Sequence, residues 1–221
     1  ETVAEHTVAL VLAVARRIVE GDSFVRSKKY KGWAPDLLLG AELKGKTLGI
    51  VGHGRIGCRT ADIFKKGFDM KTIYYDVIGP DVHEVCGAKK HSLQALLKQA
   101  DVVSLHVPLL ASTRHLIGKK ELKAMKKTAY LVNTARGPIV DEKVLVEALK
   151  DGGIAGAALD VFEKEPNGRP SGCFSLKCPP SSSNSASSSS MSIFSISSSS
   201  IFSASKNSFS SFIRYILNPS L

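Results

Sequence analysis

The amino-acid sequence predicts an α/β protein with a Rossmann-type, doubly wound parallel sheet. From residue 46 onward, continuous apolar runs alternate with amphipathic helical patterns, which is typical of parallel strands covered by helices on both faces. The first apolar run leads directly into a glycine-rich segment, where folds of this class turn from strand to helix and bind phosphate. We therefore expect ligand chemistry at the carboxyl ends of the strands.

A G-x-G-x-x-G motif lies directly behind the apolar run 47–51 and before a helical pattern that we expect to end at Gly67. In such motifs the first glycine permits a tight turn, the second lets backbone N–H groups approach a pyrophosphate, and the third lets the helix pack against the strand. A glycine turn without a ligand is the alternative, but the strand before it and the helix after it favour a dinucleotide site. The motif residues are Gly52, His53, Gly54, Arg55, Ile56 and Gly57.

The second apolar run, 71–76, ends in Asp76, which lies about 20 residues beyond the glycines, at the spacing of a ribose-binding carboxylate. A carboxylate there accepts hydrogen bonds from the adenosine ribose and repels a 2′-phosphate, and residues 77–79 contain no arginine to neutralise one. The sequence therefore predicts NAD rather than NADP as the cofactor. A solvated aspartate at a strand end is the alternative.

The rest of the α/β pattern supplies further strand ends at the same edge. The expected elements are a short helix opened by Ser92, a strand over 101–107, a short helix over 120–125, a strand over 128–133, a helix over 142–150 that Gly152 ends, and a strand over 154–160. Besides the glycine motif, the strand ends carry Asp76, His106, Val107, Pro108, Thr134, Ala135, Arg136 and Asp160.

The chain divides into three expected units. Residues 1–45 form a helix and an arm, 46–166 the dinucleotide-binding domain, and 167–221 a low-complexity tail. We expect one helix from Thr2 to Glu20, ended by Gly21, and its apolar character nearly all round predicts burial on several sides. The basic arm 22–45 contains Trp33 and the run 37–39, whose apolar side chains predict contact with another domain or subunit.

The tail from residue 167 is rich in serine and has neither a helical period nor strand and turn signals. We expect it to be disordered. A functional serine-rich tail is one interpretation, and an out-of-frame reading is the one we favour. The chain also begins without an initiator methionine, which indicates that it starts inside a longer protein.

Composition argues against several other classes of function. The net charge of +10 does not indicate a nucleic-acid partner, because the basic residues are scattered rather than gathered in a stripe. The most apolar run, 8–15, is far shorter than the ~20 residues of a membrane span. The four cysteines match no zinc or redox spacing, so we expect free thiols, no bound metal and a cytoplasmic location.

Three segments, 42–57, 133–141 and 156–166, together resemble the NAD-binding domain of the D-isomer-specific 2-hydroxyacid dehydrogenases. Within that family, the phosphoglycerate dehydrogenase and glyoxylate/hydroxypyruvate reductase branches look most similar. The resemblance covers residues 1–166 and implies hydride transfer between NAD(H) and a small 2-hydroxy or 2-oxo acid. It also implies a homodimer built through residues 1–45.

The resemblance assigns a role to each strand-end residue. It implies that Arg55 and Ile56 lie over the pyrophosphate, that Asp76 holds the adenosine ribose, and that Asp160 meets the nicotinamide end. The residues that it places along the cofactor cleft are His106, Val107, Pro108, Thr134 and Ala135.

Two catalytic roles follow from the same resemblance. Arg136 matches the arginine that binds the substrate carboxylate, and a planar guanidinium suits that task because it donates two parallel charge-assisted hydrogen bonds. A phosphate-binding or surface arginine is the alternative. Glu165 matches the carboxylate that pairs with the catalytic histidine and raises its pKa, although the neighbouring Glu163 is chemically identical.

The sequence departs from the family at the proton donor. The family's general acid/base is a histidine in a Pro-His motif beyond the glutamate, but no histidine follows His115 here. His106 matches a cleft-lining position, and we do not assign it proton transfer. The family's substrate domain, which precedes the N-terminal helix, is also missing. We therefore expect a truncated dehydrogenase with weak or no turnover. The other interpretation is a non-catalytic NAD(H)-binding module that resembles the dehydrogenase-like corepressors.

Overall fold

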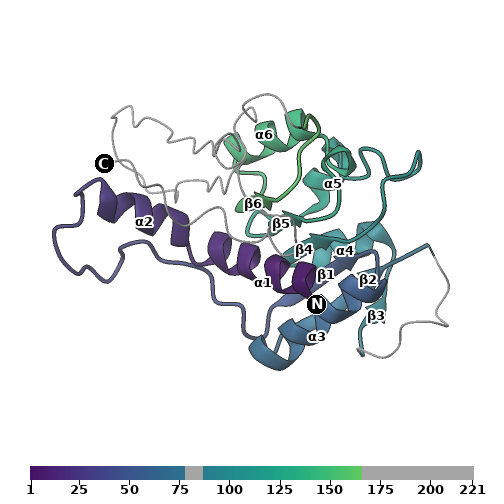
Figure 1. Cartoon of the computed structure of the whole chain (residues 1–221), viewed down its shortest axis with the longest axis horizontal. Helices are drawn as coiled ribbons and strands as arrows, with labels where there is room; N and C mark the ends of the chain where they lie inside the picture. Colours follow the sequence, from purple (N-terminus) through teal and green to yellow (C-terminus); the bar gives the residue numbers. More distant parts are fainter. Residues whose placement is uncertain (78–86, 166–221) are drawn as a thin grey trace, which may run out of the picture.

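The computed structural model describes residues 1–77 and 87–165, and within them it contains a parallel six-stranded sheet (Figure 1). The strand order, β3-β2-β1-β4-β5-β6, runs outward in both directions from β1. This confirms the Rossmann-type, doubly wound prediction. The strands are β1 (Thr47–Val51), β2 (Lys71–Tyr75), β3 (Lys89–Lys90), β4 (Val102–Leu105), β5 (Tyr130–Asn133) and β6 (Gly156–Leu159).

Helices cover both faces of the sheet. Helices α1 and α3 pack on one face, and α4, α5 and α6 cover the other (Figure 1). Alternate residues of a strand point to opposite faces, so Val102 of β4 contributes to the core under α1 and α3, whereas Val103 contributes to the other core. The helices are α1 (Thr2–Ala15), α2 (Ile18–Arg26), α3 (Arg55–Phe68), α4 (Leu93–Gln99), α5 (Lys119–Ala124) and α6 (Glu142–Lys150).

The N-terminal segment is two helices, so the prediction of one helix from Thr2 to Glu20 is wrong. Arg17 adopts a left-handed conformation with φ of 57° between α1 and α2, and Gly21 lies inside α2 rather than ending a helix. The physical cause is a contact from the arm: the backbone N–H of Ala41 donates to the Ala15 carbonyl at 2.8 Å. In a continuous helix that carbonyl would accept a hydrogen bond from the backbone N–H of the residue four positions later.

Burial of this segment is one-sided within the described chain, so its burial on several sides stays a prediction. Helix α1 buries one row of side chains, which includes Thr7, Val11 and Val14, and α2 buries none. In the arm, the Trp33 side chain is 83% exposed and that of Leu39 is 62% exposed. Residues 1–45 therefore present apolar surface that the described part of this chain does not cover.

Three smaller features differ from the sequence-based expectations. Helix α3 continues through Gly67 to Phe68 and ends at Asp69, whose φ of 51° is left-handed. The edge strand β3 consists of two lysines and pairs with β2, so no apolar pattern marked it. Cys58 of α3 is disulfide-bonded, so the expected free thiol is wrong there. The predicted disorder of the tail concerns residues outside the described ranges.

Candidate functional site

The turn between β1 and α3 needs glycine at its first position. Gly52 has a φ of +91°, and a Cβ on it would lie 2.8 Å from the His106 carbonyl and from Val107 Cγ1. Its backbone N–H donates to the Tyr75 carbonyl at 2.9 Å. The turn is therefore wedged between the carboxyl ends of β2 and β4.

The other two glycines of the motif have different surroundings. A Cβ on Gly57 would lie 2.3 Å from the Gly52 carbonyl oxygen and 2.9 Å from Ile50 Cγ2, so α3 packs on β1 more closely than any side chain would allow. At Gly54 no heavy atom lies within 4 Å of an added Cβ among the described residues. The open side of the turn is thus at the N-terminus of the 14-residue α3, where Arg55 and Ile56 are exposed.

Asp76 is joined directly to the glycine turn. Its Oδ2 accepts a hydrogen bond from the backbone N–H of His53 at 2.7 Å. The His53 side chain is fully buried and stacks on Tyr74 of β2, with ring centroids 4.2 Å apart. The sequence predicted a ribose contact for Asp76 and no site role for His53, because the middle positions of this motif carry no residue preference that would mark an anchor.

The end of β4 holds a neutral histidine. His106 Nε2 lies 2.9 Å from Ser104 Oγ, and its backbone N–H donates to the Val51 carbonyl at 2.7 Å. Burial, with a smaller contribution from nearby His53, lowers the pKa of His106 to about 4. The ring is therefore uncharged near neutral pH. Val107 is half-buried beside it, and Pro108 is exposed.

The end of β5 is shaped by Asn133, a residue that sequence analysis quoted in a motif without giving it a role. The buried Asn133 side chain donates to the Arg136 carbonyl and accepts from the Ala135 backbone N–H, both at 3.0 Å. It thereby fixes the backbone of the loop 134–136. The Arg136 side chain is exposed, and its Nη1 donates to the Ala135 carbonyl at 2.6 Å.

The segment after β6 packs against this loop. A Cβ on Gly137 would lie 1.9 Å from the Phe162 carbonyl carbon, so only glycine fits between the two backbones. Glu163 Oε1 lies 2.9 Å from His115 Nε2, whereas Glu165 Oε1 accepts from the Phe162 backbone N–H at 2.7 Å. The two glutamates that the sequence could not separate therefore have different partners.

Asp160 and Thr134 both contact helix α1. Asp160 Oδ1 lies 3.2 Å from His6 Nε2, and the Asp160 backbone N–H donates to the Asn133 carbonyl at 3.0 Å. Thr134 Oγ1 lies 3.0 Å from Thr7 Oγ1 in a buried contact. All the predicted site residues thus lie along one edge of the sheet.

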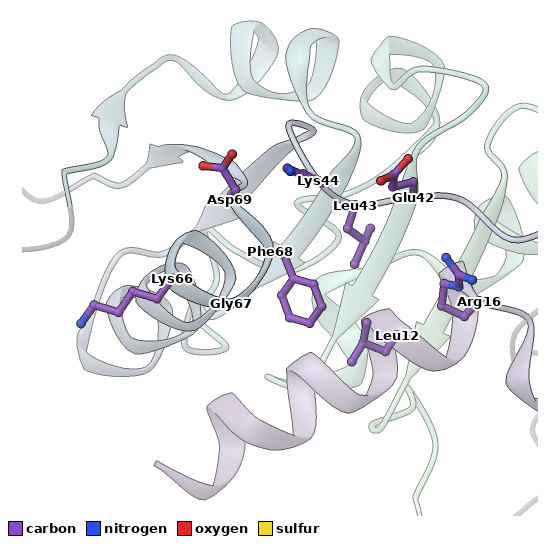
Figure 2. A pocket seen from close by; sticks show the side chains of 9 residues that line it. All are labelled: Leu12, Arg16, Glu42, Leu43, Lys44, Lys66, Gly67, Phe68 and Asp69. Carbon is purple, nitrogen blue, oxygen red and sulfur yellow. The ribbon is translucent and has the colours of Figure 1, made fainter.

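A pocket of about 410 Å³ lies at the opposite edge of the sheet from the predicted site, near the N-terminal ends of β1 and β2 (Figure 2). It is bordered by the C-terminal end of α1, the segment 42–44 and the C-terminal end of α3. None of the predicted site residues lines it. Within residues 1–77 and 87–165 no cluster of three metal-ligating side chains occurs, and none of the helices there is long and apolar enough to cross a membrane.

The glycine turn, the carboxylate after β2 and the open helix N-terminus together define a dinucleotide-binding domain of the Rossmann type. Comparison with known proteins identifies the family of this domain. A sequence model described as the D-isomer specific 2-hydroxyacid dehydrogenase, NAD binding domain, matches residues 8–179. The chain belongs to this family.

Two curated relatives are named as a glyoxylate reductase and a glycerate dehydrogenase. A glyoxylate reductase from Aeropyrum pernix is 54% identical over 171 residues, which cover 75% of this chain and 51% of the relative. A glycerate dehydrogenase from Cucumis sativus is 43% identical over 187 residues, with 77% and 49% covered. The chain therefore spans about half the length of the curated relatives that it matches.

Solved structures agree in fold. A D-lactate dehydrogenase from Aquifex aeolicus, in complex with NAD and lactic acid, superposes with a TM-score of 0.67 at 40% identity and covers 75% of this chain and 49% of that one. A Thermus thermophilus protein, TT0316, gives a TM-score of 0.70 at 47% identity, with 76% and 52% covered. Both values support the same α/β architecture.

Proposed function

We propose that this chain is the NAD(H)-binding part of an NAD-dependent 2-hydroxyacid dehydrogenase. One observation carries the proposal: the β1–α3 turn is open at Gly54, closed by backbone contacts at Gly52 and Gly57, and joined to Asp76 through the His53 N–H. These residues fit a dinucleotide, with the pyrophosphate over the N-terminus of α3 and the adenosine ribose beside Asp76.

The substrate class follows from Arg136 and from the relatives. The exposed guanidinium at the end of β5 would bind a carboxylate. The names of the relatives specify glyoxylate, glycerate and lactate, which all carry a carboxylate. When bound, NADH supplies a hydride to C2 of a 2-oxo acid. Arg136 would hold the substrate carboxylate. Glu165, predicted to pair with a catalytic histidine, accepts from the Phe162 backbone N–H in this structure, and the contact with a histidine is made by Glu163.

A second function has specific support. No histidine follows His115 in the sequence, and burial lowers the pKa of His106 to about 4, so this histidine is a poor proton donor near pH 7. These two observations favour an NAD(H)-binding module without turnover. Cofactor binding is common to both functions, and only turnover separates them.

The proposal is tested by fluorescence titration of the folded chain with NADH. We expect saturable binding and an energy-transfer signal from Trp33 or the tyrosines to the bound cofactor. Absence of binding to folded protein at millimolar NADH would overturn both functions. Circular dichroism on the same sample establishes that the protein is folded.

We also propose that the chain self-associates through residues 1–45. Exposed apolar side chains gather on α2 and the arm, with Ile18 56% exposed, Val25 60% exposed and Trp33 83% exposed. Exposed apolar patches of this kind are typical of subunit interfaces.

The cytoplasmic location was predicted from the expectation that all four cysteines are free thiols. Cys58 is disulfide-bonded, so this expectation no longer supports that location.

A further inference from the structure

Two consecutive residues of α1 contact the cofactor edge of the sheet. His6 Nε2 lies 3.2 Å from Asp160 Oδ1, and Thr7 Oγ1 lies 3.0 Å from Thr134 Oγ1. Helix α1 packs against β5 and β6. Thr134 and Asp160 directly follow these strands, so both contacts lie at their carboxyl ends. His6 is therefore held against the edge by a second contact, one residue along the helix, that is fully buried.

The strand order shows which half of a dinucleotide meets Asp160. Asp76 follows β2 on one side of the glycine turn, and Asp160 follows β6 on the other side, beyond β4 and β5. A dinucleotide crosses such a sheet at the point where the strand order reverses, with its two halves on opposite sides. With the adenosine half at Asp76, the nicotinamide half lies on the side of Asp160. This step rests on the proposed function.

We propose that His6 is a positioning residue for the nicotinamide half of the site, and that the charge of the His6–Asp160 pair sets the preference between NAD⁺ and NADH. The nicotinamide ring carries a positive charge in NAD⁺ and none in NADH. With His6 neutral, the pair has a charge of −1 and attracts the oxidised ring. With His6 protonated, the pair has no net charge and this attraction disappears.

The contact of His6 with Asp160 sets the direction of the pH dependence. The hydrogen bond to Asp160 raises the pKa of His6, burial opposes this, and the charge of Asp160 adds to it. The preference for NAD⁺ is therefore lost as the pH falls through a value above the ordinary histidine pKa of about 6.5.

Other charged groups lie on the elements packed against α1, and three arginines among them form ion pairs or hydrogen bonds with residues other than His6 and Asp160. Arg59 of α3 pairs with Glu1 and Asp62, Arg17 pairs with Glu20 at the far end of α1, and the Arg136 guanidinium contacts the Ala135 carbonyl. Glu5 is the acidic residue on α1 itself, and Glu1 precedes the helix. All of these are present in every His6 variant, so a difference between variants reports the His6 charge.

The test measures the dissociation constants of NAD⁺ and NADH for the full chain from about pH 6 to about pH 9, a range that contains the ordinary histidine pKa. We expect the affinity for NAD⁺ relative to NADH to rise roughly threefold to tenfold across this range, which is the size of the interaction between unit charges about 4 Å apart in water. A ratio that does not change with pH, in a protein that binds both forms, overturns the inference and leaves the proposed function intact. Failure to bind either form overturns both.

Two substitutions separate charge from structure. His6→Gln keeps a hydrogen-bond donor without a titrating charge, so the ratio should stay at its high-pH value. His6→Lys keeps a positive charge throughout this range, so the ratio should stay at its low-pH value. His115→Gln is the matched control, because its ring contacts Glu163 rather than Asp160, and it should titrate like the parent. If both His6 variants bind with the parent's pH profile, the inference is wrong; circular dichroism confirms that each is folded.

Discussion

The Asp76 carboxylate accepts a hydrogen bond from the backbone N–H of His53 at 2.7 Å. The residue proposed to select the cofactor is therefore also an anchor of the glycine turn. A carboxylate beside the ribose repels a 2′-phosphate, whereas the contact with His53 requires only an acceptor oxygen. These two functions of Asp76 can be separated by substitution.

Asp76→Asn should change cofactor selectivity with little loss of the turn. The asparagine amide oxygen can still accept from the His53 N–H, but the negative charge is gone, so the ratio of NADPH to NADH affinity should rise. Asp76→Ala removes the acceptor as well and should also weaken binding of NADH. Fluorescence titrations with both cofactors measure these effects. Equal selectivity in Asp76→Asn and the parent would show that this carboxylate does not choose the cofactor.

The three motif glycines should respond differently to alanine. Gly52→Ala places a side chain at φ of +91° and 2.8 Å from the His106 backbone, so it should lower the free energy of unfolding by more than about 1 kcal/mol. Gly57→Ala should also destabilise, because its Cβ would lie 2.3 Å from the Gly52 oxygen. Gly54→Ala meets no neighbouring atom and is the control. It should preserve stability and weaken NADH binding. Urea unfolding and titration distinguish the three.

Asn133 should prove important for the loop that carries Arg136. Asn133→Ala removes the acceptor of the Ala135 N–H and one of two donors to the Arg136 carbonyl, which keeps the Ile139 N–H. Each lost hydrogen bond costs about 0.5–1.5 kcal/mol. Urea unfolding should therefore show a clear loss of stability. Arg136→Ala, which removes an exposed side chain, should change stability by less than about 0.5 kcal/mol. Comparable losses in the two variants would contradict the role assigned to Asn133.

The sequence was sufficient to predict the sheet, its strand ends and the glycine turn, because continuous apolar runs and the glycine spacing are local patterns. It could not predict the break at Arg17, because the cause is a tertiary contact in which the Ala41 N–H takes the Ala15 carbonyl. The same limit explains the His6–Asp160 pair. In each case the two partners lie on different strands, helices or loops, and no spacing within one segment marks them.

Self-association should depend on the exposed apolar side chains of the arm. The double substitution Trp33→Ser and Leu39→Ser should shift the chain toward the monomer in sedimentation velocity experiments, since these side chains are 83% and 62% exposed. Leu110→Ser is a matched control, because Leu110 is 56% exposed in the segment after β4. A parent protein that is monomeric at tens of micromolar would contradict the proposed interface.

The chain should oxidise NADH with glyoxylate or hydroxypyruvate at a rate near background. A positioned general acid or base typically contributes about 10²–10⁴-fold, and His106 at the end of β4 is a poor proton donor. Burial holds the pKa of His106 at about 4, so almost none of its rings are protonated near pH 7. His106→Asn should accordingly leave the rate unchanged in samples that still bind NADH, which is the control for folding. Ordinary dehydrogenase turnover by the parent chain, abolished in His106→Asn, would show instead that His106 transfers the proton.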